Sequence, residues 1–183
     1  ATDYGFEGLY RSTNSGTSFT KISTTPSNIL GWVSAGNDQG GQGWYDLTID
    51  ASPTNASEIV VGGVNIWKST NGGSSFNIIG HWTGSGAPYV HADNHDLYYL
   101  DGSTLFAAND GGIFKSSNGG SSWIDLSDGL QIAQMYGFGQ SSSNANLLIQ
   151  GWQDNGTNLY TGSWNQTMGG DGMLCFIDRT NDN

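Results

Sequence analysis

Short runs that alternate apolar and polar residues recur along the chain, and turn-forming residues separate them. In the clearest stretch four runs follow one another: YDLTID at 45–50, EIVVGG at 58–63, NIWKS at 65–69 and SFNIIG at 75–80. Alternation with a period of two is typical of strands with one buried face. No window of similar length shows the helical period of about 3.6 residues. The pattern therefore predicts an all-β chain.

The same order of four runs returns further along: DLYYL at 96–100, TLFAAN at 104–109, GIFKS at 112–116 and SWIDLS at 122–127. An octet joins the third run to the fourth and occurs three times, as STNSGTSF at 12–19, STNGGSSF at 69–76 and SSNGGSSW at 116–123. Its asparagines Asn14, Asn71 and Asn118 are 57 and then 47 residues apart. Such spacing is typical of a four-stranded propeller blade with its loops.

Each octet is expected to form the hairpin between the third and fourth strands of a blade. Serine and asparagine side chains bond the backbone of such a turn, and glycine supplies a positive φ. The closing aromatic residue is expected to pack between neighbouring sheets. The residues with this structural role are Ser12, Asn14, Gly16, Phe19, Ser69, Asn71, Gly73, Phe76, Ser116, Asn118, Gly120 and Trp123.

The octets follow S-x-[DN]-x-G-x-[ST]-[WF], which resembles the Asp-box (BNR repeat) of bacterial sialidases, sortilin-type receptors and tandem-propeller xyloglucan hydrolases. All three copies carry asparagine where that family usually has aspartate. The resemblance implies a β-propeller built from Asp-box hairpins. It does not imply one activity, because receptors, hydrolases and scaffolds share the motif.

The repeats predict a partial β-propeller of about three to four four-stranded antiparallel blades. Closed propellers need roughly 4 to 8 blades, so the open sheet faces are expected to be covered by remaining propeller blades or by another copy of the chain. The expected parts are the end of a blade at 1–27, blades at 41–80 and 91–127, a degenerate blade at 132–168 and the start of another at 171–183.

The net charge of the chain limits the classes of partner that it can bind. Five Lys and Arg stand against 16 Asp and Glu, for a net charge of -11. Such an acidic chain repels phosphate backbones and anionic lipid, so no nucleic acid partner is expected. No apolar run approaches the roughly 20 residues of a membrane span. The single cysteine excludes an internal disulfide and a cysteine-rich metal site.

Propeller topology predicts two poles, with the octets at one and the blade-linking loops at the other. The opposite pole also receives the turns between second and third strands. Its segments are GQGWYD at 41–46, HADNHD at 91–96, DGLQIAQ at 128–134, GGDGM at 169–173, GGVN at 62–65, NDGG at 109–112 and QDNG at 153–156. Ligands are expected at this pole.

His91, Asp93 and His95 are candidate ligands for a divalent metal. In an extended segment residues two apart share a face, and two imidazoles with one carboxylate suit such an ion. The alternative is a polar network that only holds the loops together. No other cofactor is expected.

Asp110, Asp154 and Asp171 are candidate catalytic carboxylates, each in a glycine-containing turn. Glycoside hydrolysis needs two carboxyl groups roughly 5 to 10 Å apart, and NDGG and GGDG resemble the Asp-Gly-Gly turns near the catalytic acids of the xyloglucan-hydrolase propellers. The alternative is that these residues simply form turns. Sialidase chemistry is not expected, because it uses three arginines and the chain has only Arg11 and Arg179.

Aromatic residues on the same loops are candidate sugar contacts, since flat rings stack on sugar faces. Their alternative role is packing. The candidate ligand-binding residues are Trp44, Tyr45, Trp82, Trp152 and Gln153.

These features favour a secreted or cell-surface propeller without catalytic activity, acting as an extracellular structural protein or carbohydrate-binding module. Its expected partner is a polysaccharide or other glycan, or an extracellular protein. The alternative function is a glycoside hydrolase of the xyloglucan-hydrolase type that uses paired aspartates.

Overall fold

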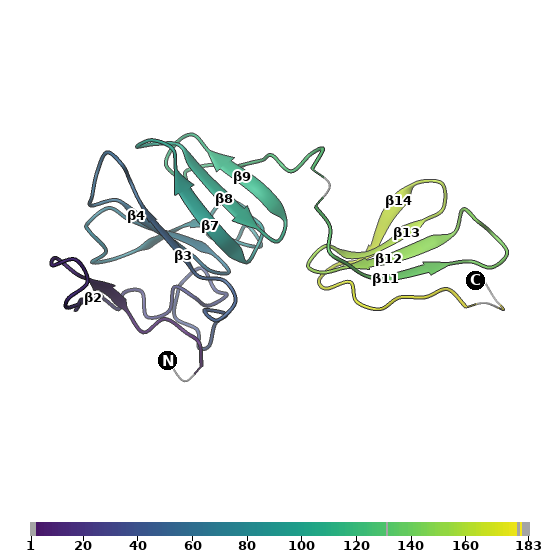
Figure 1. The fold of residues 1–183 in the computed structure, drawn as a ribbon, viewed down its shortest axis with the longest axis horizontal. Coiled ribbons are helices and arrows are strands. Elements are labelled where there is room, and N and C mark those ends of the chain that lie inside the picture. Colours follow the sequence, from purple (N-terminus) through teal and green to yellow (C-terminus); the bar gives the residue numbers. More distant parts are fainter. Residues whose placement is uncertain (1–2, 131, 179, 181–183) are drawn as a thin grey trace. The chain divides into compact units, whose positions relative to one another are not determined.

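The computed structural model describes residues 3–130, 132–178 and 180, and these residues form strands, turns and loops without a helix (Figure 1). No helix that could cross a membrane is therefore found in this part of the chain. The chain divides into two compact units, Ala1–Asp128 and Gly129–Asn183. Each unit is described by itself below.

The described residues of the first unit form three antiparallel sheets in chain order. The first sheet pairs β1 (Leu9–Arg11) with β2 (Thr20–Ser23). The second has the order β3 (Thr48–Ala51), β4 (Ile59–Gly62), β5 (Ile66–Ser69) and β6 (Asn77–Gly80). The third has the order β7 (Asn94–Tyr99), β8 (Leu105–Asn109), β9 (Gly112–Ser116) and β10 (Ile124–Asp125).

The hydrophobic core lies between the second and third sheets, where β3 and β7 are neighbours. Val60 and Ile66 face it from one sheet, and Leu97, Leu105 and Phe114 face it from the other. The alternation seen in the sequence explains this packing, because every second residue of a strand points to the same face. Successive four-stranded meanders packed face to face confirm the predicted all-β, blade-like architecture.

The register of the third sheet places the octet opposite the histidine-bearing loop. Asn94 pairs with Asn109, and Asn109 pairs with Gly112 at one end. Tyr99 pairs with Leu105, and Leu105 pairs with Ser116 at the other. The octet begins at Ser116, so the expectation of two poles is confirmed in this sheet.

All three octets form the same hydrogen-bonded turn. In the third copy the Ser116 hydroxyl accepts from the backbone N–H of Gly120 at 2.9 Å, and Asn118 Oδ1 accepts from the N–H of Ser122 at 2.9 Å. The first and second copies repeat both bonds. The turn chemistry predicted for these residues is therefore present.

The closing aromatic residues of the octets differ in their packing. Phe76 is 5% exposed in a core with Trp67, and Trp123 donates its indole N–H to the Ile79 carbonyl at 2.8 Å. Phe19, in contrast, is 64% exposed. The predicted packing between sheets is wrong for Phe19, because no sheet of the described residues covers that side of β1 and β2.

In the second unit the described residues form one antiparallel sheet of β11 (Met135–Gln140), β12 (Leu148–Trp152), β13 (Gly156–Tyr160) and β14 (Trp164–Met168). Residues 171–178, predicted to begin another blade, form no strand and lie against β11. A Cβ on Gly137 would come within 2.8 Å of the Cys175 backbone nitrogen, so glycine permits this close approach. Residues 179 and 181–183 of the predicted blade lie outside the described part.

Candidate functional site

A tight turn in the loop before β3 separates two aromatic side chains from an acidic one. The backbone N–H groups of Tyr45 and Asp46 both donate to the Gln42 carbonyl, at 2.7 and 3.0 Å. The side chain of Trp44 is directed to solvent, with the residue 68% exposed, whereas Asp46 is 1% exposed. The sequence names Trp44 and Tyr45 as candidates, but it gives no sign that Asp46 is buried.

The loop before β7 is held by a buried asparagine and is not regularly extended. Asn94 is fully buried and donates its backbone N–H and its side-chain amide to the Gly63 carbonyl, at 2.9 and 2.8 Å. Asp93 has a φ of 63°, and the ladder between β7 and β8 slips at His95. The alternation expected to place His91, Asp93 and His95 on one face is therefore broken at two points, and the bulge re-aims His95.

His95 and Tyr45 both hold Asp110, which lies in the turn between β8 and β9. The His95 Nε2 and the Tyr45 hydroxyl each contact one Asp110 oxygen at 2.7 Å. The His91 ring packs where a side chain on Gly111 would lie, so this turn requires glycine. His91 lies beside the turn with a contact from its Nδ1 to the Ala92 carbonyl at 3.3 Å. The set His91, Asp93 and His95 stays a prediction as a metal site.

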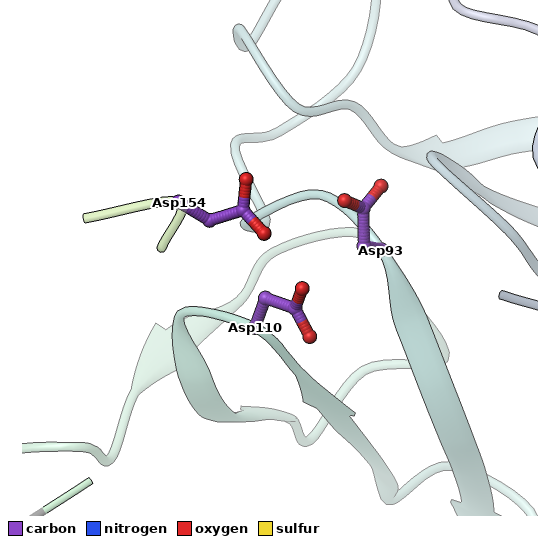
Figure 2. Close-up of side chains that lie close together, drawn as sticks. All are labelled: Asp93, Asp110 and Asp154. Atoms are coloured by element: carbon purple, nitrogen blue, oxygen red, sulfur yellow. The ribbon is translucent and has the colours of Figure 1, made fainter. Parts of the chain in front are cut away.

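Three carboxyl groups, Asp46, Asp93 and Asp110, meet at this pole of the first unit, and we refer to them as the acid cluster. Figure 2 shows Asp93 and Asp110 directing their carboxyl groups toward a common space, and an oxygen of each lies within 4.8 Å of the other. Gln42 donates its side-chain amide to Asp93 Oδ1 at 2.8 Å.

Burial governs the protonation of the acid cluster. Desolvation, reinforced by the charge of Asp93 and a hydrogen bond between the two carboxyl groups, raises the pKa of Asp46 to about 8. Desolvation and the charge of Asp110 also raise the pKa of Asp93. At neutral pH Asp46 and Asp93 can therefore share a proton.

An exposed row of rings leads from solvent to the acid cluster. Tyr4 meets Trp44 with ring centroids 6.5 Å apart, and Trp44 meets Tyr45 at 5.5 Å. Tyr45 in turn meets the His95 ring edge-on at 4.9 Å. We call Tyr4, Trp44 and Tyr45 the aromatic row. Tyr4 is 58% exposed and carries no sequence signal for this role, because only folding brings it to the linking loop.

The remaining aromatic candidate of the first unit, Trp82, lies apart from this row among other contacts. Its indole N–H donates to the Trp32 carbonyl at 3.1 Å and its ring stacks with His81 at 6.3 Å. The residue is 42% exposed, so part of the ring surface is open to solvent. A role in ligand binding stays a prediction.

In the second unit, Asp154 and Asp171 are brought together. The backbone N–H of Asp154 donates to Asp171 Oδ1 at 3.1 Å, and Asp154 has a φ of 56°. Trp152 donates its indole N–H to Gln150 at 3.0 Å, and Gln153 donates its backbone N–H to Gln134 at 3.0 Å. Their predicted roles in catalysis and ligand binding stay predictions.

Comparison with known proteins gives structural likenesses only. Neither a protein-family model nor a curated protein matches the chain. The chain is similar to a GH74 enzyme from Niastella koreensis, with 20% identity over 88% of this chain and 26% of that one and a TM-score of 0.47. An ancestral GH74 enzyme shows 22% identity over 90% and 22% of the two chains, with a TM-score of 0.44.

YCF48 from Cyanidioschyzon merolae is a further similar structure, with 13% identity over 66% of this chain and 36% of that one and a TM-score of 0.36. The likeness is one of fold. The chain spans only 22% to 36% of the length of these three proteins. Function does not transfer at this level of similarity.

Proposed function

We propose that the chain is a carbohydrate-binding module of a secreted or cell-surface protein, and that the aromatic row is its sugar platform. The observation that carries this proposal is the arrangement of Tyr4, Trp44 and Tyr45 as adjacent exposed rings that end at Asp110. Aromatic faces bury the C–H surface of a sugar, and carboxylate oxygens accept from its hydroxyl groups. The row therefore offers both kinds of contact at one pole.

Charge selects the class of glycan. The chain has a net charge of -11, and Asp46, Asp93 and Asp110 lie beside the row. A negative field repels sulfated, uronic or sialylated glycans. A neutral polysaccharide is the ligand class that fits.

The three octets are proposed to be asparagine variants of the Asp-box that stabilise hairpins and do not contact the ligand. Their position at the pole opposite the histidine-bearing loop supports this division of roles in the third sheet. The proposed extracellular location rests on the same Asp-box resemblance.

An apolar hollow on the first unit supports the further proposal that another blade or another copy of the chain packs there. The hollow has a volume of about 300 Å³ and is lined by Leu9, Leu30, Leu47, Ile49 and Val61 among others. Leu47 and Ile49 are 59% and 55% exposed. The sheet beside it has two strands where its neighbours have four, which leaves the apolar lining uncovered.

The proposed function predicts that Trp44→Ala weakens binding to neutral glycans by about tenfold or more, because it removes the middle ring of the row. Screening the chain on an array of neutral and anionic glycans, followed by calorimetric titration with the best oligosaccharide, measures this loss. Trp164→Ala is the matched control, since Trp164 is 44% exposed in the second unit. Equal binding by the Trp44 variant and the unchanged chain would refute the platform.

Glycoside hydrolysis is the second candidate, favoured by the raised pKa of Asp46 beside Asp110. Such enzymes pair a protonated carboxylic acid with an ionised carboxylate. Hydrolysis ranks second because Asp46 is 1% exposed and Asp93 is 8% exposed. In this conformation of the loops, neither carboxyl group can reach a glycosidic oxygen.

If hydrolysis is the function, neutral polysaccharides incubated with the chain will release reducing ends, and Asp110→Asn will reduce the rate by about a hundredfold or more, the range of a lost acid–base catalyst. Asp96→Asn, at an exposed position of β7, serves as the control. Binding of a polysaccharide without any release of reducing ends would contradict the hydrolase function.

A further inference from the structure

The acid cluster contains a buried carboxyl group, that of Asp46, which forms no ion pair with a described basic residue. Both carboxyl oxygens of Asp46 are inaccessible to solvent, and no described N–H or O–H group outside the acid cluster donates a hydrogen bond to them. The polar group that faces them is the carboxyl of Asp93, which is itself 8% exposed. An ionised carboxylate in such a setting is costly unless a cation or several donors surround it.

The basic residues of the first unit lie elsewhere. Lys68 pairs with Glu58 at 2.8 Å, Lys115 lies over the Phe106 ring and Lys21 over the Tyr10 ring. Among the described residues, no Lys or Arg forms an ion pair with Asp46 or Asp93. His95 bonds Asp110, and the charge of His91 offsets only part of the rise in the pKa of Asp93. A proton shared by Asp46 and Asp93, or a cation bound in its place, can neutralise this pair of carboxyl groups.

We propose that Asp46, Asp93 and Asp110 bind a divalent cation, and that Ca²⁺ is the ion that fits. Oxygen ligands at about 2.3 to 2.6 Å from one Ca²⁺ lie up to about 5 Å from each other. The oxygens of Asp93 and Asp110 lie within 4.8 Å of each other. One ion can therefore bridge this pair, and the carboxyl of Asp46 lies next to that of Asp93.

The ligand chemistry selects the class of metal. Three carboxylates without a thiolate favour a hard cation over zinc or copper. The His95 nitrogen nearest the cluster already bonds Asp110 at 2.7 Å. Ca²⁺ accepts irregular sets of six to eight oxygens and can complete its shell with water, whereas Mg²⁺ requires a near-ideal octahedron. This site differs from the set His91, Asp93 and His95 in its ligands and in the metal it would take.

The loops that supply the three ligands are already held in place. Asp46 is fixed by its N–H bond to Gln42, Asp93 by the amide of Gln42, and Asp110 by Tyr45 and His95. A bound ion would join the loop before β3, the loop before β7 and the turn after β8. We expect the bound ion to stabilise these loops and to fix the position of Tyr45. The cation site does not rest on the proposed binding of glycans.

The test is a calorimetric titration of the whole chain, stripped with EDTA, with CaCl₂ and in parallel with MgCl₂, in the absence of glycan. We expect one saturable Ca²⁺ site per chain and weaker Mg²⁺ binding. Terbium provides a second readout, because a Tb³⁺ ion bound at this site lies close enough to Tyr45 and Trp44 to be excited through them. A rise in melting temperature that depends on Ca²⁺ concentration is also expected.

Asp46→Asn is expected to weaken Ca²⁺ affinity by about tenfold or more, since affinity follows the number of charged ligands. Asp96→Asn makes the same charge change at an exposed position of β7 and is expected to stay within about twofold of the parent chain. If Asp46→Asn does not fold, as judged by circular dichroism, Asp110→Asn takes its place. No saturable binding, or an equal loss in the Asp96 and Asp46 variants, would overturn the proposal.

Discussion

Leu105→Ala is expected to lower the free energy of unfolding of the first unit by about 3 to 5 kcal/mol. Leu105 is fully buried and belongs to the core between the second and third sheets, with Val60 and Ile66 opposite it. Truncation removes apolar contacts from both sheets and leaves a cavity that flat, hydrogen-bonded sheets cannot easily close. Urea unfolding followed by tryptophan fluorescence measures the change.

Leu100→Ala is the matched control for this prediction. Leu100 follows β7 in the same sheet and is 55% exposed, so its truncation is expected to change stability by about 0.5 kcal/mol or less. Similar losses in both variants would show that the two sheets do not share a well-packed core.

Gly120→Ala is expected to destabilise the first unit by about 2 to 4 kcal/mol, through two separate effects. Gly120 has a φ of 94°, a backbone conformation that costs an L-residue about 1 to 2 kcal/mol. An added Cβ would also lie 2.5 Å from Ile79 Cδ1 and 3.0 Å from Ile79 Cβ. Ile79 belongs to β6 of the preceding sheet, so the substitution also pushes the two sheets apart. Thermal and urea unfolding measure the combined cost.

Gly16→Ala separates the two effects. Gly16 holds the same place in the first octet with a φ of 84°, and an added Cβ there would meet nothing within 4 Å. Its substitution is expected to cost only the backbone term, about 1 to 2 kcal/mol. Were the two variants equally destabilised, the octet hairpin would not be docked on the preceding sheet.

The sequence predicted only part of the acid cluster. The sequence indicated Asp93 and Asp110 as chemically interesting because each sits in a loop at the predicted functional pole. It paired Asp93 with His91 and His95, on the assumption of an extended loop, whereas the structure has a positive φ at Asp93 and a bulge at His95. Asp46 appears in the sequence only as the last residue of a linking loop, because burial of a carboxyl leaves no mark on the sequence.

The fold, like the site, has parts that the sequence determines and parts that only tertiary structure determines. The sequence by itself determined the strands and the octet turns, because the bonds of Ser116, Asn118 and Gly120 join residues at most four apart and alternation chooses the buried face of each strand. Tertiary structure alone decided that Phe19 is exposed while Phe76 is buried, and that Asp46, Asp93 and Asp110 meet. Those outcomes depend on which sheets are neighbours and where their loops converge, and contacts between residues far apart in the chain have no period or spacing that a sequence displays.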